Sequence, residues 1–183
     1  LVDGGTATQA APDAWGPKIT NAINNAENFF QTGITYNNNL SVSAGGERTN
    51  VRASIGNMNQ TGIVPNTKFS RTSVRVNTDT RLNNKISFGS SLNFINSGGT
   101  RSQNGSNLSG VMLSLLRTPA NFDLRGGKGS DYWKNPDGSN YTYFAPYDNP
   151  YWSVYENPFT DDVNRLLGNT YITYRPLDWL DVT

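Results

Sequence analysis

The chain has 183 residues, of which 35% are hydrophobic and only 16% are charged, and its mean hydropathy is -0.58. Soluble domains usually contain about 25% charged residues, so neutral Asn, Ser, Thr and Gly residues supply most of the polarity. The formal net charge of +1, the scattered Lys and Arg residues and the absence of cysteine and histidine argue against nucleic-acid binding, a disulfide framework and histidine- or thiolate-based chemistry.

The first part of the chain is expected to be irregular and then weakly helical. Residues 1–16 are rich in Gly, Ala, Thr and Pro, and Pro17 can open a helix because its nitrogen needs no partner there. The Asn residues that follow are poor helix formers, so we predict a short or frayed helix. Its apolar positions would be Ile19, Ile23, Ala26 and Phe30.

Between Gln31 and Phe94, small polar and apolar residues alternate with the period of two that β-strands show. Tight turns are expected at Gly45-Gly46 and at Asn83-Asn84, where Asn tolerates a positive φ, and a longer link at 59–70. Short and long connections alternate in this way in outer-membrane barrels, whose periplasmic turns are short and extracellular loops long. The predicted strands are 32–44, 48–58, 71–82 and 85–95.

The apolar positions of these strands share one predicted face, and segments of about ten residues match the length of a tilted transmembrane strand. Arg52, Arg75 and Asn77 fall on the opposite face. The same alternation also fits the core of a soluble β-sandwich, which composition alone favours. The positions predicted to contact lipid are Leu40, Val42, Val51, Ile55, Val74, Val76, Ile86, Phe88, Leu92 and Phe94.

The regular pattern is interrupted between residues 96 and 162. Residues 97–109 are rich in Gly, Ser and Asn, and an amphipathic helix follows from Leu108 to Leu116, which Pro119 ends. Strand character returns at 163–175 and again from Trp179. A long structured connection of this kind is uncommon in compact domains and is usually functional.

This connection contains many aromatic residues, which stack on sugar rings and anchor protein interfaces. They are candidates for contacts to a ligand or a protein partner. Alternatively, the rings pack on one another to hold the long connection together. The candidate binding residues are Tyr132, Trp133, Tyr141, Tyr143, Tyr151 and Trp152.

Acidic residues provide weaker signals. Asp131 and Asp137 lie near Asn135 and Asn140, and calcium binds such oxygen ligands, although the spacing matches no EF-hand. The carboxylates of Asp161-Asp162, Asp178 and Asp181 are interpreted as solvated groups at strand ends. A glycoside hydrolase would need two carboxylates across a cleft, for which Asp131 and Asp161 are candidates, but we expect a protein that is not an enzyme.

Several runs of residues resemble the start of the barrel in SusC/RagA-type TonB-linked outer-membrane proteins. NLSVSAGG at 39–46 is followed by RTN at 48–50 and GIVPNTKFSR at 62–71, and the succession of these runs at matching spacing carries the resemblance. FFQTG at 29–33 precedes them, and a strand with RVN at 75–77 and LN at 82–83 follows, before RTP at 117–119. Ala44 replaces the usual Gly, and Val51 stands where an aromatic residue is common.

The resemblance implies an all-β protein, a transmembrane antiparallel barrel of about 22 strands with an N-terminal plug. It implies import of oligosaccharides or peptides across a Bacteroidetes-type outer membrane, with a SusD-like surface lipoprotein as partner and TonB as the source of force. Residues 1–28 would be the end of the plug and its link to the barrel. Residues 29–183 would be the first strands, with a long extracellular loop that carries a short helix.

We expect the chain to be an interior piece of a longer protein, because it starts without Met at Leu1 and stops at Thr183 inside an expected strand. The TonB-binding segment, most of the plug and the remaining strands would then lie elsewhere. The alternative from another class is a secreted, soluble β-sandwich that binds carbohydrate through its aromatic segment.

Overall fold

The computed structural model describes residues 20–183, so the predictions for 1–16, Pro17 and Ile19 lie outside the described residues. The described chain consists mainly of one antiparallel β-sheet with three short helices. It divides into two compact units. The sheet unit contains residues 34–60, 69–99 and 161–183, and the helical unit contains residues 20–33, 61–68 and 100–160.

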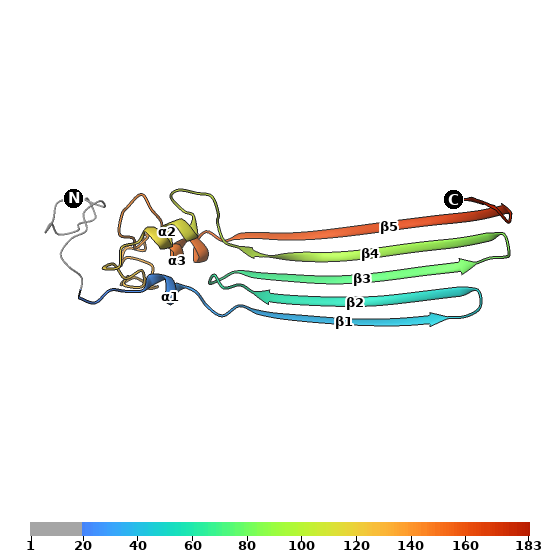
Figure 1. The fold of residues 1–183 in the computed structure, drawn as a ribbon. Coiled ribbons are helices and arrows are strands. Elements are labelled where there is room, and N and C mark those ends of the chain that lie inside the picture. Colours follow the sequence, from blue (N-terminus) through green and yellow to red (C-terminus); the bar gives the residue numbers. More distant parts are fainter. Residues whose placement is uncertain (1–19) are drawn as a thin grey trace. The chain divides into compact units, whose positions relative to one another are not determined.

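The sheet has six strands that follow one another in chain order from β1 to β6, and five of them are long (Figure 1). Strands of globular proteins usually have about 3–10 residues, whereas β1 has 12 and β5 has 19. The predicted strands are therefore confirmed, and β2 to β5 are longer than predicted, whereas β1 begins two residues later than predicted. Their bounds are β1 Ile34–Gly45, β2 Thr49–Thr61, β3 Lys68–Arg81, β4 Ile86–Arg101, β5 Phe159–Leu177 and β6 Leu180–Val182.

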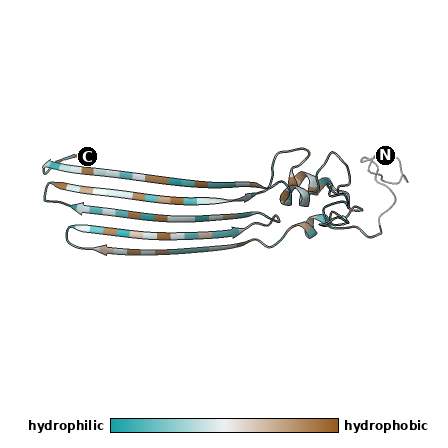
Figure 2. Cartoon of the chain, turned by 180° about the vertical axis from the view of Figure 1, so that it is seen from behind, coloured by the Kyte–Doolittle hydropathy of each residue, from teal (hydrophilic) through white to brown (hydrophobic). Residues whose placement is uncertain are grey.

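Backbone hydrogen bonds next to the connections show the register of the long strands. Gly46 donates to the Thr49 carbonyl at 2.9 Å, and Leu82 donates to the Ile86 carbonyl at 2.9 Å. Side-chain bonds farther along agree with these registers, for example Ser91 to Asn77 at 2.7 Å. A constant register keeps alternate residues on one face along the whole strand, and hydrophobic and hydrophilic positions alternate accordingly (Figure 2).

The register places the ten positions predicted to contact lipid on one face, here called the apolar face. One row of this face crosses five strands and is apolar throughout. The next row towards the start of β1 is polar throughout. The apolar row is Leu40, Ile55, Val74, Phe94 and Leu166, and the polar row is Asn38, Asn57, Thr72, Asn96 and Asn164.

Side chains of the polar row hydrogen-bond to each other across strands. The Asn57 amide donates to the Thr72 hydroxyl at 3.1 Å, and the Asn96 amide donates to the Asn164 side-chain oxygen at 2.9 Å. Asn59 also donates to Asn57 at 2.6 Å. The apolar area of this face therefore ends at a row of neutral polar groups, which are hydrogen-bonded between β2 and β3 and between β4 and β5.

Charged residues of the strands lie mainly on the opposite face, here called the polar face. Arg52, Arg75 and Asn77 lie on it, as predicted. Within the strands of the described chain, the register leaves only Lys68 and Asp162 on the apolar face, both beyond the row of Asn and Thr residues. The apolar rows themselves contain no charge.

The sheet unit has no apolar core of its own. None of the buried hydrophobic residues of the described chain belongs to it, and Leu40 and Leu166 are 66% and 70% exposed. A sandwich core would require a second sheet on the apolar face, and residues 20–183 form one sheet only. The apolar face is therefore open to its surroundings.

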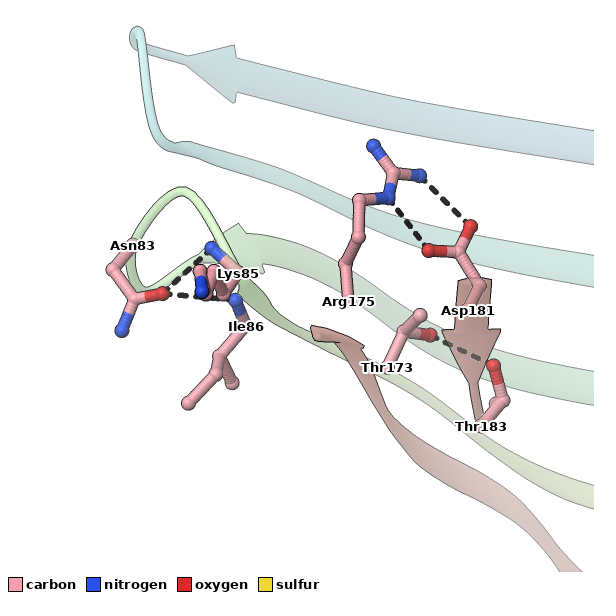
Figure 3. Close-up of polar contacts among 7 residues, drawn as sticks. All are labelled: Asn83, Lys85, Ile86, Thr173, Arg175, Asp181 and Thr183. Carbon is pink, nitrogen blue, oxygen red and sulfur yellow. Dashed lines mark hydrogen bonds and ion pairs between the residues drawn. The ribbon is translucent and has the colours of Figure 1, made fainter. Parts of the chain in front are cut away.

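The hairpin between β3 and β4 differs from the prediction. Leu82 bonds to Ile86, and Asn66 is the one residue other than glycine with positive φ in residues 20–183, so Asn83 and Asn84 do not adopt the predicted backbone. Instead the Asn83 side chain accepts from the backbone nitrogens of Lys85 and Ile86 at 2.8 and 2.9 Å (Figure 3). An Asn side chain can mimic a backbone turn in this way.

The Gly-rich stretch that was predicted to be a loop from residue 97 continues β4 to Arg101. Gly98 lies so close to β5 that an added Cβ would overlap the backbone of Asp161 and Asp162. Glycine inside a strand often marks such a close approach of two backbones. The sequence pattern missed this because a run of small polar residues also suits a loop.

The helical unit contains α1 (Asn25–Phe29), α2 (Val111–Arg117) and α3 (Pro150–Tyr155). The prediction of a short first helix is confirmed, and α2 is shorter than the predicted helix, which included Leu108. The helix α3 was missed, although Asn149 before Pro150 is a start signal. The core of this unit is Phe29, Val111, Leu115, Leu124, Tyr151 and Val154.

The segment before β1 folds with the long connection. The Ile23 nitrogen donates to the Ala120 carbonyl at 2.8 Å, and the Asn25 amide donates to the Phe122 carbonyl at 2.7 Å. The described part of the predicted 1–28 segment thus belongs to the helical unit together with residues 100–160.

Candidate functional site

Aromatic rings from α3 and the preceding segment form a network in the helical unit. Trp133 stacks on Tyr155 with 4.4 Å between ring centroids. Tyr132 meets Trp133 and Tyr151 edge to face at 4.7 and 5.0 Å. Such arrangements are preferred because the edge and face of an aromatic ring have opposite partial charges.

Tyr151 is fixed at the base of this network. It is 4% exposed, meets Phe29 edge to face at 4.8 Å, and donates its hydroxyl proton to the Asn28 carbonyl at 2.9 Å. Asn149 begins α3 by accepting from the Tyr151 nitrogen at 2.9 Å. The fully buried Asn149 amide also donates to the Leu124 carbonyl at 2.7 Å, which ties α3 to the core.

A pocket of about 610 Å³ opens beside these rings. Its volume falls within the range of about 300–1,000 Å³ that is usual for small-molecule sites. Four separate segments of the helical unit contribute to it, so tertiary packing creates the pocket. Its lining residues are Asn28, Phe29, Phe30, Gln31, Pro65, Asp123, Arg125, Tyr132, Tyr151 and Tyr155.

Polar groups accompany the rings in the pocket. The Gln31 amide nitrogen donates to the Gly62 carbonyl at 2.9 Å, and the Asp123 carboxylate accepts from the Arg125 nitrogen at 2.9 Å. The Arg125 guanidinium makes no hydrogen bond or ion pair with any residue of 20–183. The pocket therefore presents an amide oxygen, a carboxylate oxygen and a guanidinium group to a ligand.

Tyr132 and Tyr151 of the pocket remain neutral over the physiological pH range. Burial, together with the nearby Tyr155 and Tyr151 hydroxyls, raises the pKa of Tyr132 to about 12. Burial also raises the pKa of Tyr151 above its usual value. Because loss of a proton would place a negative charge in a partly desolvated site, these hydroxyls stay protonated.

An ion cluster supports the network from behind Trp133. The Lys134 ammonium lies 2.7 Å from the Glu156 carboxylate and 3.1 Å from the Asp131 carboxylate, and the Trp133 indole donates to Glu156 at 2.9 Å. Hydrogen bonds from Lys134 hold the pKa values of Glu156 and Asp131 below their usual range. The cluster fixes the orientation of the indole that stacks on Tyr155.

The structure brings only some of the predicted aromatic residues to the pocket, namely Tyr132 and Tyr151. Trp133 stacks behind them. Tyr141 stacks on Phe122 at 4.8 Å and Tyr143 meets the same ring at 6.2 Å, so both pack internally. The Lys134 ammonium lies 6.0 Å from the Trp152 ring, and Trp152 does not line the pocket.

Sequence reasoning missed Phe30, Gln31, Asp123 and Arg125 as pocket residues, whereas Tyr155 belongs to the aromatic connection in which contacts were expected. Phe30 and Gln31 belong to the FFQTG run, which supported the family resemblance but predicted no binding role for either residue. No pattern connects residues 123–125 to them, because these segments meet only after folding.

The acidic residues considered for calcium have other partners. Asp131 pairs with Lys134, and the Asp137 carboxylate accepts from the Ser139 nitrogen and hydroxyl at 3.0 and 2.6 Å. No group of three or more acidic side chains gathers anywhere in residues 20–183. A calcium site near Asp131 and Asp137 stays a prediction that these contacts do not favour.

The acidic residues of the sheet are not arranged as a pair. Asp161 and Asp162 are adjacent in β5 and therefore lie on opposite faces. Asp181 accepts from Arg175 at 2.6 and 2.8 Å across β5 and β6 (Figure 3). This bidentate contact and the Thr173–Thr183 hydroxyl pair at 3.0 Å join the two strands.

No family model matches the sequence, and no curated protein matches it either. Among the helices of residues 20–183, none has the length and apolar character needed to cross a membrane. Two features of residues 20–183 bear on function: an apolar face of the sheet whose apolar rows contain no charge, and an aromatic pocket in the helical unit with polar groups that keep hydrogen-bonding capacity.

Proposed function

We propose that this chain forms part of the wall of a transmembrane β-barrel in a bacterial outer membrane. The apolar face is the observation that supports this proposal. Five neighbouring strands carry aligned apolar side chains that no other part of the described chain covers, and the strand charges lie on the other face or beyond the polar row. Lipid-facing strands require this pattern, because a charged side chain at mid-bilayer costs about 2–4 kcal/mol.

The extent of the apolar face agrees with a bilayer. Along β4 it runs from Phe94 to Ile86, which corresponds to about 27 Å at roughly 3.4 Å per residue. A strand tilt of about 40° reduces this to a height of about 21 Å, close to the apolar band of about 25 Å in outer-membrane barrels. The Asn and Thr row would then lie at the membrane boundary.

The lengths of the connections suggest an orientation. Residues 46–48 and 82–85 connect strands at one end of the sheet, whereas 62–67 and 102–158 connect them at the other. Outer-membrane barrels have short periplasmic turns and longer extracellular loops. We therefore expect the connections at 62–67 and 102–158 on the outer side of the membrane.

We further propose that the barrel belongs to a TonB-dependent importer of the SusC/RagA type, with a SusD-like lipoprotein as partner and an oligosaccharide or peptide as cargo. The succession of motifs from 29–33 to 117–119 supports this proposal, together with the pocket in the helical unit. A secreted β-sandwich is less consistent with the fold, because one sheet of residues 20–183 leaves its apolar face open.

Membrane fractionation of the full-length protein tests the barrel. We expect the protein in the outer-membrane fraction, resistant to extraction by carbonate and shifted in electrophoretic mobility when heated, as a folded barrel is. An inner-membrane protein and a periplasmic protein from the same cells serve as controls. Recovery of the protein only in the soluble or secreted fraction would reject the proposal.

Affinity purification from gently solubilised outer membranes tests the partner. We expect a surface lipoprotein to copurify with the tagged protein in near-stoichiometric amounts. A tagged barrel protein of unrelated function is the control for non-specific recovery. A preparation that is pure, folded and free of any lipoprotein would reject the partner while leaving the barrel proposal intact.

A further inference from the structure

The pocket of the helical unit has aromatic surfaces that a ligand can reach. Tyr132, Tyr155 and Phe30 are 38%, 37% and 36% exposed, whereas Phe29 and Tyr151 are buried beneath them. The exposed rings have fixed neighbours, since Tyr155 stacks on Trp133 and Phe30 meets Phe29 edge to face at 5.6 Å. Rigid, half-exposed rings can contact a ligand with little loss of conformational entropy.

The polar groups at the same pocket are planar and have free hydrogen-bonding capacity. Gln31 uses its amide nitrogen on Gly62 and keeps its oxygen, and Asp123 uses one carboxylate oxygen on the Arg125 nitrogen. The Arg125 guanidinium makes no hydrogen bond or ion pair within residues 20–183. Planar amide, carboxylate and guanidinium groups can each form two adjacent hydrogen bonds, which matches neighbouring hydroxyl groups on a ring.

The two charges of the pocket lining cancel, so the lining has no net charge that would attract an anion or a cation. Asp123 contributes one negative charge and Arg125 one positive charge, and the remaining lining residues are neutral. An anionic ligand would meet the Asp123 carboxylate, and a cationic ligand would meet the Arg125 guanidinium. A neutral ligand rich in hydroxyl groups uses both residues without repulsion.

We propose that this pocket binds one or two rings of a neutral oligosaccharide. A pyranose ring would stack on Tyr132, Tyr155 or Phe30 with its C–H face, while its hydroxyls bond to Arg125 and Asp123. A peptide bound as an added β-strand is less suited, because that mode needs the backbone groups of a strand edge, and the pocket presents side chains instead. This inference rests on the proposed nutrient importer and selects saccharide over peptide as its cargo.

Calorimetric titration of the full-length protein in lauryldimethylamine oxide, a detergent without a sugar headgroup, tests the site. The probes are maltohexaose, cellohexaose, xylohexaose and mannohexaose, with a tryptic digest of casein as the peptide probe. We expect at least one hexasaccharide to bind with a Kd between about 1 µM and 1 mM, and the peptides not to bind.

Two variants locate the binding. Arg125→Ala removes an exposed group that has no partner in residues 20–183, and Phe30→Leu removes an aromatic face while keeping an apolar side chain. Each should weaken hexasaccharide binding at least tenfold. Lys128→Ala is the matched control, because it removes an exposed cation from the same segment outside the pocket, and it should change Kd less than twofold.

Three results would overturn the site: no binding of any hexasaccharide, binding of casein peptides instead, or binding that both variants leave unchanged. These failures can be told apart from failure of the proposed function. If the protein binds a hexasaccharide but is found in the soluble fraction, the binding site is supported and the importer is rejected. If the protein is found in the outer membrane but binds none of the four hexasaccharides, only the binding site is rejected.

Discussion

Tyr171 on β5 crosses over Gly89 on β4 to reach Asp79 on β3. The Tyr171 hydroxyl donates to the Asp79 carboxylate at 2.9 Å, and an added Cβ at Gly89 would overlap the Tyr171 ring. All three residues lie on the polar face, at matching positions of neighbouring strands. The ring covers a backbone that glycine leaves bare, as aromatic residues do beside glycines in other sheets.

Replacing Gly89 should therefore destabilise the sheet. We expect Gly89→Ala to lower the free energy of unfolding by about 1–3 kcal/mol, because the Tyr171 ring must move. Tyr171→Phe should cost less than Gly89→Ala, because it removes one exposed hydrogen bond and keeps the ring. Gly46→Ala is the control, since an added Cβ there meets nothing. Equal midpoints for Gly89→Ala and Gly46→Ala in urea unfolding would contradict the packing role.

The ion cluster around Lys134 predicts a response to acid. Hydrogen bonds from Lys134 lower the pKa values of Glu156 and Asp131 below their ordinary values of 4.5 and 3.8. A carboxyl group with a lowered pKa in the folded state stabilises that state above its ordinary pKa, and this stabilisation disappears as pH falls through the lowered value. The helical unit should therefore lose stability below about pH 4.5.

Tryptophan fluorescence during thermal unfolding at several pH values measures this effect, because Trp133 donates to Glu156. The wild-type melting temperature should fall between about pH 5 and pH 3. Glu156→Gln removes one titrating carboxyl group and should show a smaller fall from a lower starting value. An identical pH dependence in wild type and Glu156→Gln would contradict a role for this cluster.

At the scale of the elements, the 62–67 connection is held by contacts with the rest of the helical unit. Asn66 has φ 57°, and its side-chain amide donates to the backbone carbonyl oxygen of Val154 in α3 at 2.6 Å. Pro65 is buried, and Val64 packs against the core. The Gln31 nitrogen also donates to the Ile63 carbonyl at 2.9 Å. A connection with so many internal contacts should be rigid.

Two substitutions separate the contributions of Asn66. Asn66→Gly keeps the positive φ accessible and removes the bond to Val154, so the unfolding free energy should fall by about 1 kcal/mol. Asn66→Ala removes the same bond and adds the strain of a left-handed backbone, for a total of about 2 kcal/mol. Denaturant unfolding monitored by tryptophan fluorescence compares them. If Asn66→Gly were less stable than Asn66→Ala, strain of the left-handed backbone would not explain the difference between the two variants.

At the scale of the whole molecule, the arrangement of charge distinguishes a membrane wall from a water-exposed sheet. Val42 and Ser43 are consecutive residues of β1, so they lie at nearly the same position along the strand but on opposite faces of the sheet. Both are exposed in the described chain. In water, arginine at either position would have a similar small effect. In a bilayer, only the apolar face excludes charge.

We expect Val42→Arg to lower the free energy of unfolding from lipid vesicles by about 2–4 kcal/mol, and Ser43→Arg to change it by less than about 1 kcal/mol. Urea unfolding of the full-length protein in phosphatidylcholine vesicles gives both values. The same pair in detergent shows whether the difference needs a bilayer. Equal effects at the two positions in vesicles would mean that β1 does not face lipid.

The local sequence determined the strands and the composition of their two faces. Period-two alternation depends only on neighbouring residues, so Leu40 and Val42 could be separated from Ser41 and Ser43 without knowledge of the fold. Turn residues also marked the hairpins, although Asn83 forms its turn through the side chain instead of a positive φ. Gly98 and the start of α3 were missed, because their signals also occur in loops.

Only the tertiary structure decided which residues meet across long separations in the chain. The register places Leu40 and Leu166 in one row, and the core places Phe30, Asp123 and Tyr155 around one pocket. No local pattern encodes these contacts, because they arise when separate segments bury their apolar groups together. The sequence by itself therefore determined a two-faced sheet, and the fold decided that one face is continuous and that an aromatic pocket exists.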